Sequence, residues 1–140
     1  MHRDTNIAVV GIIVCGGYCL FLRRTNSPNN WCPPCGRLKQ HENPLHGLQR
    51  EVWEETGLHI TPLLPVSVWD GLHNEKKIIS ITYVCVADSL HVILSEEHSE
   101  FVWMPIEDLS KQRIDTDFNI EEWPLFIKIA NIFIDEKNFL

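Results

Sequence analysis

The sequence predicts an α/β protein in which a mixed β-sheet lies between helices. Three observations predict this fold. Residues 7–22 form an apolar stretch suited to a strand hairpin, residues 44–56 carry helix signals at both ends, and two strand-like runs follow at 60–69 and 77–87. A second helix-like segment, residues 120–136, comes near the end of the chain. This order of strands and helices is typical of a sheet that is covered on both faces.

Length and composition fit this fold. A chain of 140 residues is long enough to bury a sizeable core, and we expect residues 1–140 to form a single domain. The chain is 44% hydrophobic and 22% charged, and 19 Asp+Glu against 12 Lys+Arg give a net charge of −7. Proteins that bind nucleic acids or membrane surfaces rely on Lys and Arg, so neither partner is expected. We expect a monomer or a homodimer.

The first expected element is the hairpin. Residues 7–15 and 18–22 are predicted as strands, joined by a tight turn at Gly16 and Gly17. The whole stretch is shorter than the ~20 residues that span a bilayer, and no cleavage site for a signal peptide follows it. The cysteines are odd in number and lack the spacing of a disulfide framework, which favours a reducing cytoplasm; they are Cys15, Cys19, Cys32, Cys35 and Cys85.

A loop and a helix follow the hairpin. Residues 24–36 contain three prolines and are predicted as a loop. Asn43 is the expected N-cap of the helix, and Gly57 is expected to end it in the left-handed conformation. One stripe of the helix is expected to face the core: Leu45, Leu48, Val52 and Thr56. Glu51, Glu54 and Glu55 fall beside this stripe, and Gly47, one turn earlier on their own face, is expected to leave open space for a bound diphosphate.

The remaining elements are shorter or less regular. A polar stretch, residues 70–76, is expected to link the strands at 60–69 and 77–87. A short strand at 101–104 and a helical turn at 106–112 come next. The last helix has recurring apolar positions, although a proline can shift its start; these residues are Pro124, Leu125, Ile129, Ile132 and Phe133.

Three carboxylates lie close together on the predicted helix: Glu51, Glu54 and Glu55. Acids three or four residues apart on a helix repel each other by roughly 0.2–0.5 kcal/mol per pair. A divalent cation converts that repulsion into binding, because Mg²⁺ prefers carboxylate oxygens and keeps phosphate oxygens as further ligands. The spacing therefore predicts a metal site for phosphate chemistry.

The same segment matches the Nudix box at each defining position. The matching residues are Gly36, Glu42, Arg50, Glu51, Val52, Glu54, Glu55, Gly57 and Leu58. With the preceding hairpin and the Trp-containing segment 101–105, the chain resembles MutT-like members of the Nudix hydrolase family over its whole length. The resemblance implies the Nudix α/β/α sandwich with a central mixed β-sheet.

The resemblance also implies roles for the acids. Glu51 and Glu55 would be the principal ligands of Mg²⁺ or Mn²⁺, with Glu54 beside them and the carbonyl of Gly36 as a further ligand. In relatives the carboxylate at the Glu51 position ligates metal, polarises the attacking water, or does both. Because these carboxylates act in the ionised form, activity is expected to favour neutral to alkaline pH.

Supporting residues follow from the resemblance as well. Arg50 is expected to point to another helix face and to pair with Glu42, and we group it with Glu51, Glu54 and Glu97 as the catalytic set although its role would be support. Glu97 is the expected loop acid, both as metal ligand and in catalysis, with Glu100 as the alternative. Gly57 and Glu42 are structural supports.

Contacts with the substrate are less specific in the sequence. Lys39 is placed to touch a phosphate, and Asn119 either reads a base edge or, as we favour, caps the last helix. Five aromatic residues could stack on a base, although such residues are more often part of a core: Trp31, Trp69, Tyr83, Phe118 and Trp123. Cys32 and Cys35 resemble half of a zinc site that only His41 and His46 could complete, and we do not expect that site.

The sequence therefore predicts a metal-dependent Nudix pyrophosphohydrolase. Its substrate would be a nucleoside diphosphate joined to a second group, first of all a nucleoside triphosphate cleaved to monophosphate and pyrophosphate. The alternative is a non-catalytic Nudix-fold module that binds a nucleotide or regulates a partner. Removal of a cap from RNA would need a basic surface, which an acidic chain is not expected to have.

Overall fold

The computed structural model describes residues 4–111 and 114–137. Gln112, at the end of the predicted helical turn, lies outside the described residues. The elements in chain order are β1 (Asp4–Cys15), β2 (Tyr18–Arg24), β3 (Trp31–Cys32), β4 (Cys35–Lys39), α1 (Pro44–Thr56), β5 (Ile60–His73), β6 (Lys76–Ala87), β7 (His98–Pro105), the 3₁₀ helix η1 (Ile106–Lys111) and α2 (Trp123–Lys137).

Strand β1 is the centre of a mixed sheet. It pairs with β6 in parallel and with β4 antiparallel, and it meets β2 only at their shared hairpin turn. β5 extends the sheet beyond β6, whereas β3 and β7 both pair with β2. The β1–β4 register sets Val9 opposite Gly36 and Val10 opposite Cys35. This pairing brings the start of the Nudix box into the sheet, beside α1.

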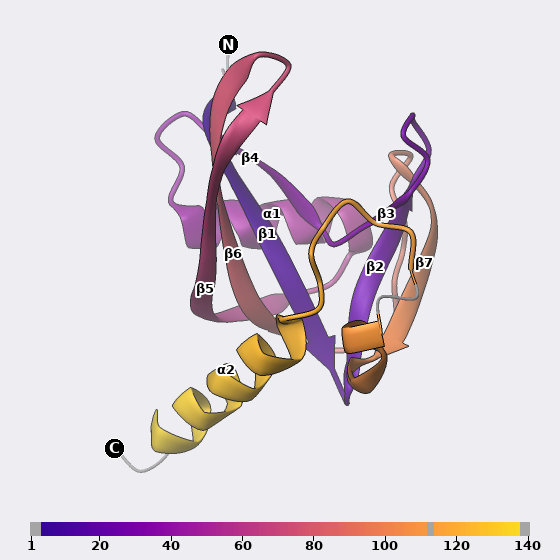
Figure 1. Ribbon diagram of the computed structural model, residues 1–140, viewed down its shortest axis with the longest axis vertical. Coiled ribbons are helices and arrows are strands. Elements are labelled where there is room, and N and C mark those ends of the chain that lie inside the picture. The colour runs from indigo at the N-terminus through magenta and orange to yellow at the C-terminus, as the bar shows by residue number, and fades with distance from the viewer. Residues whose placement is uncertain (1–3, 112–113, 138–140) are drawn as a thin grey trace.

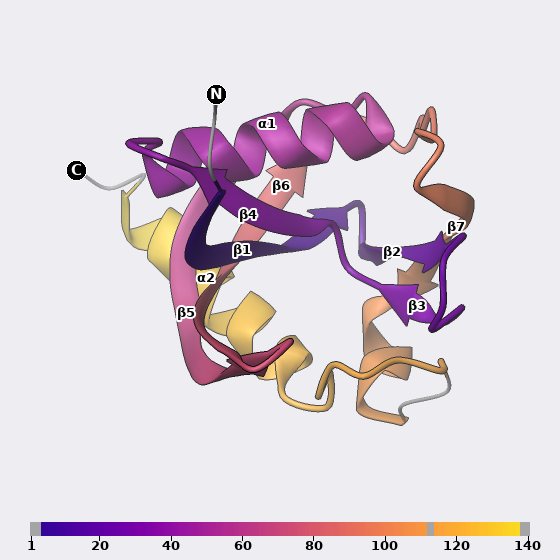
Figure 2. The same cartoon turned by 90° about the horizontal axis from the view of Figure 1, so that it is seen from above.

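Helices cover both faces of the sheet, and the predicted α/β sandwich is confirmed. Figure 2 shows α1 on one side of the strands and α2 on the other. Successive residues of β1 serve opposite cores, because side chains alternate along a strand: Ile13 packs with Leu48 and Val52 of α1, and Ile12 packs with Trp123 and Ile127 of α2. The two cores fix both helices to one sheet.

The signals at the ends of α1 act as predicted. The side chain of Asn43 accepts a hydrogen bond from the Leu45 amide at 2.9 Å. Gly57 adopts φ 71°, and its N–H donates to the Trp53 carbonyl. Leu48, Val52 and Thr56 are buried as expected, whereas Leu45 is exposed.

Several strands differ from the prediction. β4 occupies residues at the end of the predicted loop and runs on into the box. β5 and β6 continue through the polar stretch 70–76 and turn tightly at Asn74 and Glu75, both of which have positive φ. β7 begins at His98, before the predicted residue 101. In each case backbone pairing with a neighbouring strand outweighs the local polarity of the sequence.

The last helix begins later than predicted. α2 starts at Trp123, with Pro124 in its first turn, where a missing N–H costs nothing. Within residues 123–134, the buried residues of this helix are Trp123, Ile127 and Ala130, whereas Leu125, Ile129 and Ile132 are exposed. In Figure 1 this helix projects from one corner of the sheet. Within residues 4–111 and 114–137, no helix has the length and hydrophobicity needed to cross a bilayer.

Candidate metal and nucleotide site

An acidic cavity lies where the C-terminal half of α1 meets the loop before β7. It measures about 330 Å³ and is lined by Glu51, Glu54, Glu55, Ser95, Glu96 and Glu97. The three helix acids share this cavity because positions three and four residues apart lie on one side of a helix. The structure therefore brings the predicted helix acids and the predicted loop acid together.

Backbone hydrogen bonds hold the loop acid in place from two sides. The Ser95 amide donates to the Glu55 carbonyl at 3.3 Å. On the other side the Thr25 amide and hydroxyl donate to the Glu97 carbonyl at 3.1 and 3.0 Å. Glu100, the alternative loop acid, forms an ion pair with Arg23 at 3.0 Å instead. Glu97 is thus the residue that faces the helix acids.

Glu55 is buried, and no cationic side chain of residues 4–111 and 114–134 is paired with it. It is only 6% exposed. Burial first, and then the nearby charge of Glu51, raise the pKa of Glu55 to about 9. Among the described residues, its carboxylate accepts one hydrogen bond, from the Cys35 amide at 3.3 Å. At neutral pH and without a metal, Glu55 is therefore protonated.

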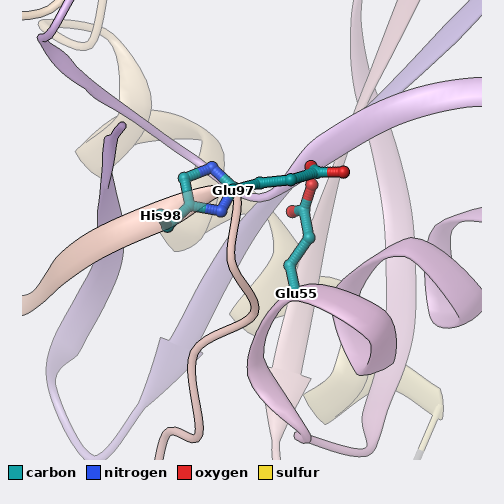
Figure 3. A group of neighbouring side chains, drawn as sticks. All are labelled: Glu55, Glu97 and His98. Carbon is teal, nitrogen blue, oxygen red and sulfur yellow. The ribbon is translucent and has the colours of Figure 1, made fainter. Parts of the chain in front are cut away.

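The donors around Glu55 fit a small divalent cation. Figure 3 shows the carboxylates of Glu55 and Glu97 pointing toward one another, with His98 beside them. One ligand atom from each of these three residues lies within 4.8 Å of the other two. An octahedral ion with bonds of about 2.1 Å needs donors about 3.0 to 4.2 Å apart, so small adjustments suffice. Carboxylate-rich sites of this kind suit Mg²⁺ and Mn²⁺.

Glu51 lies against the backbone of Gly36. A Cβ added at Gly36 would overlap the Glu51 carboxylate, so only glycine permits this approach. Burial raises the pKa of Glu51, and the adjacent Arg50 guanidinium opposes that shift. The contact places the Gly36 backbone at the edge of the acidic cavity, where the resemblance places a carbonyl ligand.

Arg50 and Glu42 form a bidentate ion pair, the pairing that the sequence predicts. Arg50 Nε lies 2.6 Å from Glu42 Oε2, and Nη2 lies 2.8 Å from Oε1. Hydrogen bonding from Arg50 lowers the pKa of Glu42 to about 2. Glu42 Oε1 also accepts from the Lys39 amide at 2.9 Å. This arrangement ties β4 to α1.

Arg50 also reaches the acids, contrary to the expectation that it points to a separate face. Its Nη1 lies 3.0 Å from Glu51 Oε1 and 3.2 Å from both oxygens of Glu54. The long side chain bends back along the helix, and i,i+4 spacing brings Glu54 within reach. Arg50 therefore neutralises one side of the acidic surface.

The expectation for Gly47 is wrong. Gly47 is buried, and a Cβ added there would overlap Leu38 and crowd Glu42. The absent side chain allows β4 to pack closely on α1. The open cavity lies instead beside Glu51 and Glu97.

A second, more apolar cavity lies on the other side of Gly36. It measures about 650 Å³ and lies between β1, β4, β5, β6 and the segment that enters α2. Trp69 and Phe118 contribute aromatic surface, while Arg37, Asp117 and Asn119 contribute polar groups. Gly36 lines this cavity and contacts Glu51, which lines the acidic one. The two cavities meet at that contact.

The predicted substrate residues have different outcomes. Asn119 does not cap α2, which begins four residues later, and it lines the apolar cavity instead. In the described part of the chain, Lys39 is not among the residues that line either cavity. Trp123 stacks on Phe21 with ring centroids 5.7 Å apart, and Tyr83 belongs to the other core. The guanidinium group of Arg23 lies over the ring of Trp31.

Sequence reasoning missed two residues. Arg37 lines the apolar cavity as the neighbour of Gly36 in β4, and its position inside the box was the available signal. His98 belongs to the group with Glu55 and Glu97, and its position next to the predicted loop acid was the available signal.

Cys32 lies near His98, with its sulfur 3.9 Å from His98 Nε2. Hydrogen bonds from Cys35 and from His98 lower the pKa of the Cys32 thiol against the effect of burial. His41 and His46 are exposed, and among the described residues neither joins the two cysteines in a group that could hold a metal. The structure gives no support to a zinc site at this position.

Comparisons with known proteins agree with this geometry. The model of the NUDIX domain family matches residues 5–124. The m7GpppN-mRNA hydrolase NUDT17 of Homo sapiens is 39% identical over 51 residues, which are 34% of this chain and 16% of that protein. A MutT-like protein of Streptomyces ambofaciens is 27% identical over 110 residues, covering 76% of this chain and 68% of that protein.

A solved structure is similar over nearly its whole length. The crystal structure of MutT protein from Methanosarcina mazei Go1 has a TM-score of 0.71 and 29% identity, covering 94% of each chain. By contrast, this chain spans only 16% and 22% of the length of the human and Bos taurus NUDT17 proteins that it matches.

Proposed function

Because this chain belongs to the Nudix family, we propose that it is a metal-dependent hydrolase that cleaves a diphosphate linkage in a nucleotide. The substrate class is a nucleoside diphosphate joined to a second group, and a nucleoside triphosphate ranks first. The observation that carries the proposal is the junction at Gly36 and Glu51, where a carboxylate-lined cavity opens beside an apolar one. A nucleotide has the matching halves, since its phosphates are anionic and its base is flat and apolar.

Glu55 and Glu97 would hold the divalent cation, Mg²⁺ or Mn²⁺, together with Glu51 and the Gly36 carbonyl. Their carboxylates approach each other in the acidic cavity, and no cationic side chain is paired with Glu55 in the described residues. Bound Mg²⁺ or Mn²⁺ would neutralise phosphate charge and polarise the scissile phosphoryl group. A chain with net charge −7 supplies little of that neutralisation itself.

Glu51 is the proposed acceptor of the water proton. Arg50 Nη1 donates to Glu51 Oε1 at 3.0 Å, which leaves Oε2 as the oxygen that can accept a proton. As water forms a bond to one phosphorus, its proton passes to Glu51 and the anhydride oxygen leaves with the other phosphate. Arg50 keeps Glu51 oriented, and Glu54, whose two oxygens also contact Arg50, completes this network.

The apolar cavity would bind the nucleoside. Trp69 is 56% exposed and lines the cavity together with Phe118, so aromatic surface is available to a base. Asp117 and Asn119 are the polar groups placed to hydrogen-bond its edge. Arg37, at the Gly36 end of the cavity, is placed to contact a phosphate, a role for which Lys39 remains the second candidate.

Several coarser proposals accompany this one. The two cores share one sheet, which supports a single domain. Free cysteines support a reducing compartment, for which we propose the cytoplasm. A relative named as an mRNA hydrolase matches over 51 residues only, and the acidic charge favours small nucleotides over RNA.

A nucleotide panel tests the proposal. Purified protein is incubated with nucleoside triphosphates, nucleoside diphosphate sugars and dinucleoside polyphosphates, with and without Mg²⁺, and the products are separated by anion exchange. We expect metal-dependent release of a nucleoside monophosphate and pyrophosphate from a triphosphate. In ¹⁸O-labelled water the label identifies the phosphorus that was attacked.

Two variants separate chemistry from binding. Glu51→Gln is expected to abolish turnover while nucleotide binding persists, and Trp69→Ala is expected to raise KM more than it lowers kcat. If the wild-type protein binds nucleotides tightly with Mg²⁺ and yields no product from any substrate, the alternative of a non-catalytic nucleotide-binding or regulatory module is correct.

A further inference from the structure

His98 lies beside the proposed cation position, and one of its ring nitrogens has no hydrogen-bond partner among the described residues. The residue is only 9% exposed. Its Nδ1 atom is buried without a hydrogen-bond partner among the described residues, while Nε2 lies 3.9 Å from the sulfur of Cys32. A buried polar atom without a partner costs about 1–3 kcal/mol, so an unpaired ring nitrogen here needs a ligand to explain it.

The surroundings of the ring favour a metal as that ligand. One ring nitrogen of His98 lies within 4.8 Å of a carboxylate oxygen from both Glu55 and Glu97, and Figure 3 shows the ring turned toward these two acids. An Nε2–H group that donates to Cys32 leaves the lone pair on Nδ1, and a hydrogen-bonded second nitrogen is typical of histidines that bind metals. Cys32 would thus orient the ring without touching the ion.

We propose that His98 supplies a nitrogen ligand to the cation held by Glu55 and Glu97, and that this ligand makes the position prefer Mn²⁺ to Mg²⁺. The inference rests on the proposed function, because it uses the same acidic cavity. Mg²⁺ binds oxygen donors almost exclusively, whereas first-row transition ions accept imidazole. A site that adds one imidazole to its oxygen ligands therefore discriminates between ions that a site made of oxygen ligands alone would bind more equally.

Direct binding measurements test the inference. Dissociation constants for Mn²⁺ are measured on the full chain from the EPR signal of free Mn²⁺, and those for Mg²⁺ from competition with Mn²⁺. In His98→Gln, Mn²⁺ affinity is expected to fall by about 10-fold or more, the range for loss of a residue that supports a metal site. Mg²⁺ affinity is expected to fall by less than about 3-fold, because the carboxylates remain.

Pulsed EPR provides a second readout. Mn²⁺ bound to the wild-type protein is expected to show hyperfine coupling to a histidine nitrogen, and this coupling is expected to disappear in His98→Gln. Thr25→Val is the matched control, because it removes a hydroxyl that holds the Glu97 loop and leaves every proposed ligand in place. This control is expected to weaken both ions by a similar factor and to keep the nitrogen coupling.

The outcomes separate this inference from the proposed function. The role of His98 is overturned if His98→Gln weakens the binding of Mn²⁺ and Mg²⁺ equally, or if the wild type shows no nitrogen coupling. This holds even if the protein hydrolyses nucleotides. Nitrogen coupling and altered ion preference in a protein that hydrolyses nothing would support the role of His98 and refute the enzyme. Circular dichroism and melting temperature establish that each variant is folded.

Discussion

The glutamates on the two sides of the acidic surface at α1 have pKa values shifted in opposite directions. On one side Glu42 lies in a bidentate pair with Arg50, and its pKa is lowered to about 2. On the other side Glu55 is buried beside Glu97, and its pKa is raised to about 9. We call these the clamp (Glu42 and Arg50) and the metal cluster (Glu55, Glu97 and His98).

This difference separates the carboxylate that stabilises the fold from the carboxylates that we propose bind a metal. The clamp is complete within the protein, because each Glu42 oxygen has a guanidinium donor. In the metal cluster, burial disfavours the charge of Glu55, and among the described residues its carboxylate accepts only the Cys35 amide; under the proposed function a cation completes the cluster. Residues of the same type, a few turns apart, therefore carry opposite expectations for substitution.

The largest expected effect comes from Glu55→Gln. Loss of a metal ligand is expected to lower kcat/KM by about 10³-fold, or about 4 kcal/mol of transition-state stabilisation. Without metal at pH 7 the melting temperature should rise, because the carboxyl ionises in the unfolded state but stays protonated in the folded state, whereas glutamine ionises in neither. Steady-state kinetics and thermal melts measure both. A fall in stability without metal would place Glu55 with the clamp.

Arg50→Met is expected to lower stability as well as activity, because Arg50 also orients Glu51. Breaking a largely buried ion pair leaves Glu42 without its partner, and we expect a loss of about 2–4 kcal/mol in the free energy of unfolding. Arg50→Lys is the control, since it keeps the charge without the planar fork, and it should restore only part of the loss. Urea denaturation without metal gives these values. Full stability in Arg50→Met would show that the clamp is dispensable for folding.

Two glycines make the comparison without altering any charge. Gly36→Ala pushes a methyl group against the Glu51 carboxylate, and we expect about a 10- to 100-fold fall in kcat/KM with little change in stability. Gly47→Ala pushes against Leu38 beside the clamp. Overpacking there, offset in part by the better helix propensity of alanine, should cost about 1 kcal/mol of stability.

Kinetics and urea denaturation of both alanine variants are needed. The separation between the two regions is refuted if Gly36→Ala chiefly unfolds the protein and Gly47→Ala chiefly inactivates it.

The last comparison concerns protons. Glu42 has a pKa lowered from 4.5, so its stabilising contribution is present above pH 4.5 and is lost as the pH falls toward 2. Glu55 has a pKa raised from 4.5, so its contribution is present below pH 4.5 and is lost as the pH rises through about 9. Melting curves of metal-free protein against pH, for Glu42→Gln, Glu55→Gln and wild type, resolve the two.

Metal binding should release the proton of Glu55. At pH 7 we expect about one proton per site on Mn²⁺ binding, and none from this position in Glu55→Gln. Calorimetric titrations in buffers of different ionisation enthalpy measure the number. Equal proton release in both proteins would contradict the buried, protonated state of Glu55.

Much of the fold follows from local signals in the sequence. Asn43 and Gly57 bound α1 as predicted, because capping depends on a few neighbouring atoms. The two cores follow from the alternation of apolar residues in β1. β4 was not predictable from its polar, proline-flanked residues, because its hydrogen bonds come from β1, far away in the chain.

In the candidate site, too, the features set by local spacing were predictable and those set by contacts between elements were not. The spacing of Glu51, Glu54 and Glu55 predicts one acidic surface, since the helix repeat fixes their neighbours. The bend of Arg50 toward Glu54 and the position of Asn119 in the apolar cavity depend on contacts between elements. His98 was not predicted, because its position next to Glu97 is a weak signal until its burial and its unpaired nitrogen are known.

Under the proposed function, the contact between Gly36 and Glu51 separates the hydrolytic site from the base-binding site, so that each can change without the other. Among the described residues, the acidic cavity and the apolar cavity share no lining residue. Under the proposed function, replacements at residues 117–119 are therefore expected to change the preferred base without changing the acids on α1. Under the proposed function, substitutions in this one surface segment are expected to be enough to change the substrate.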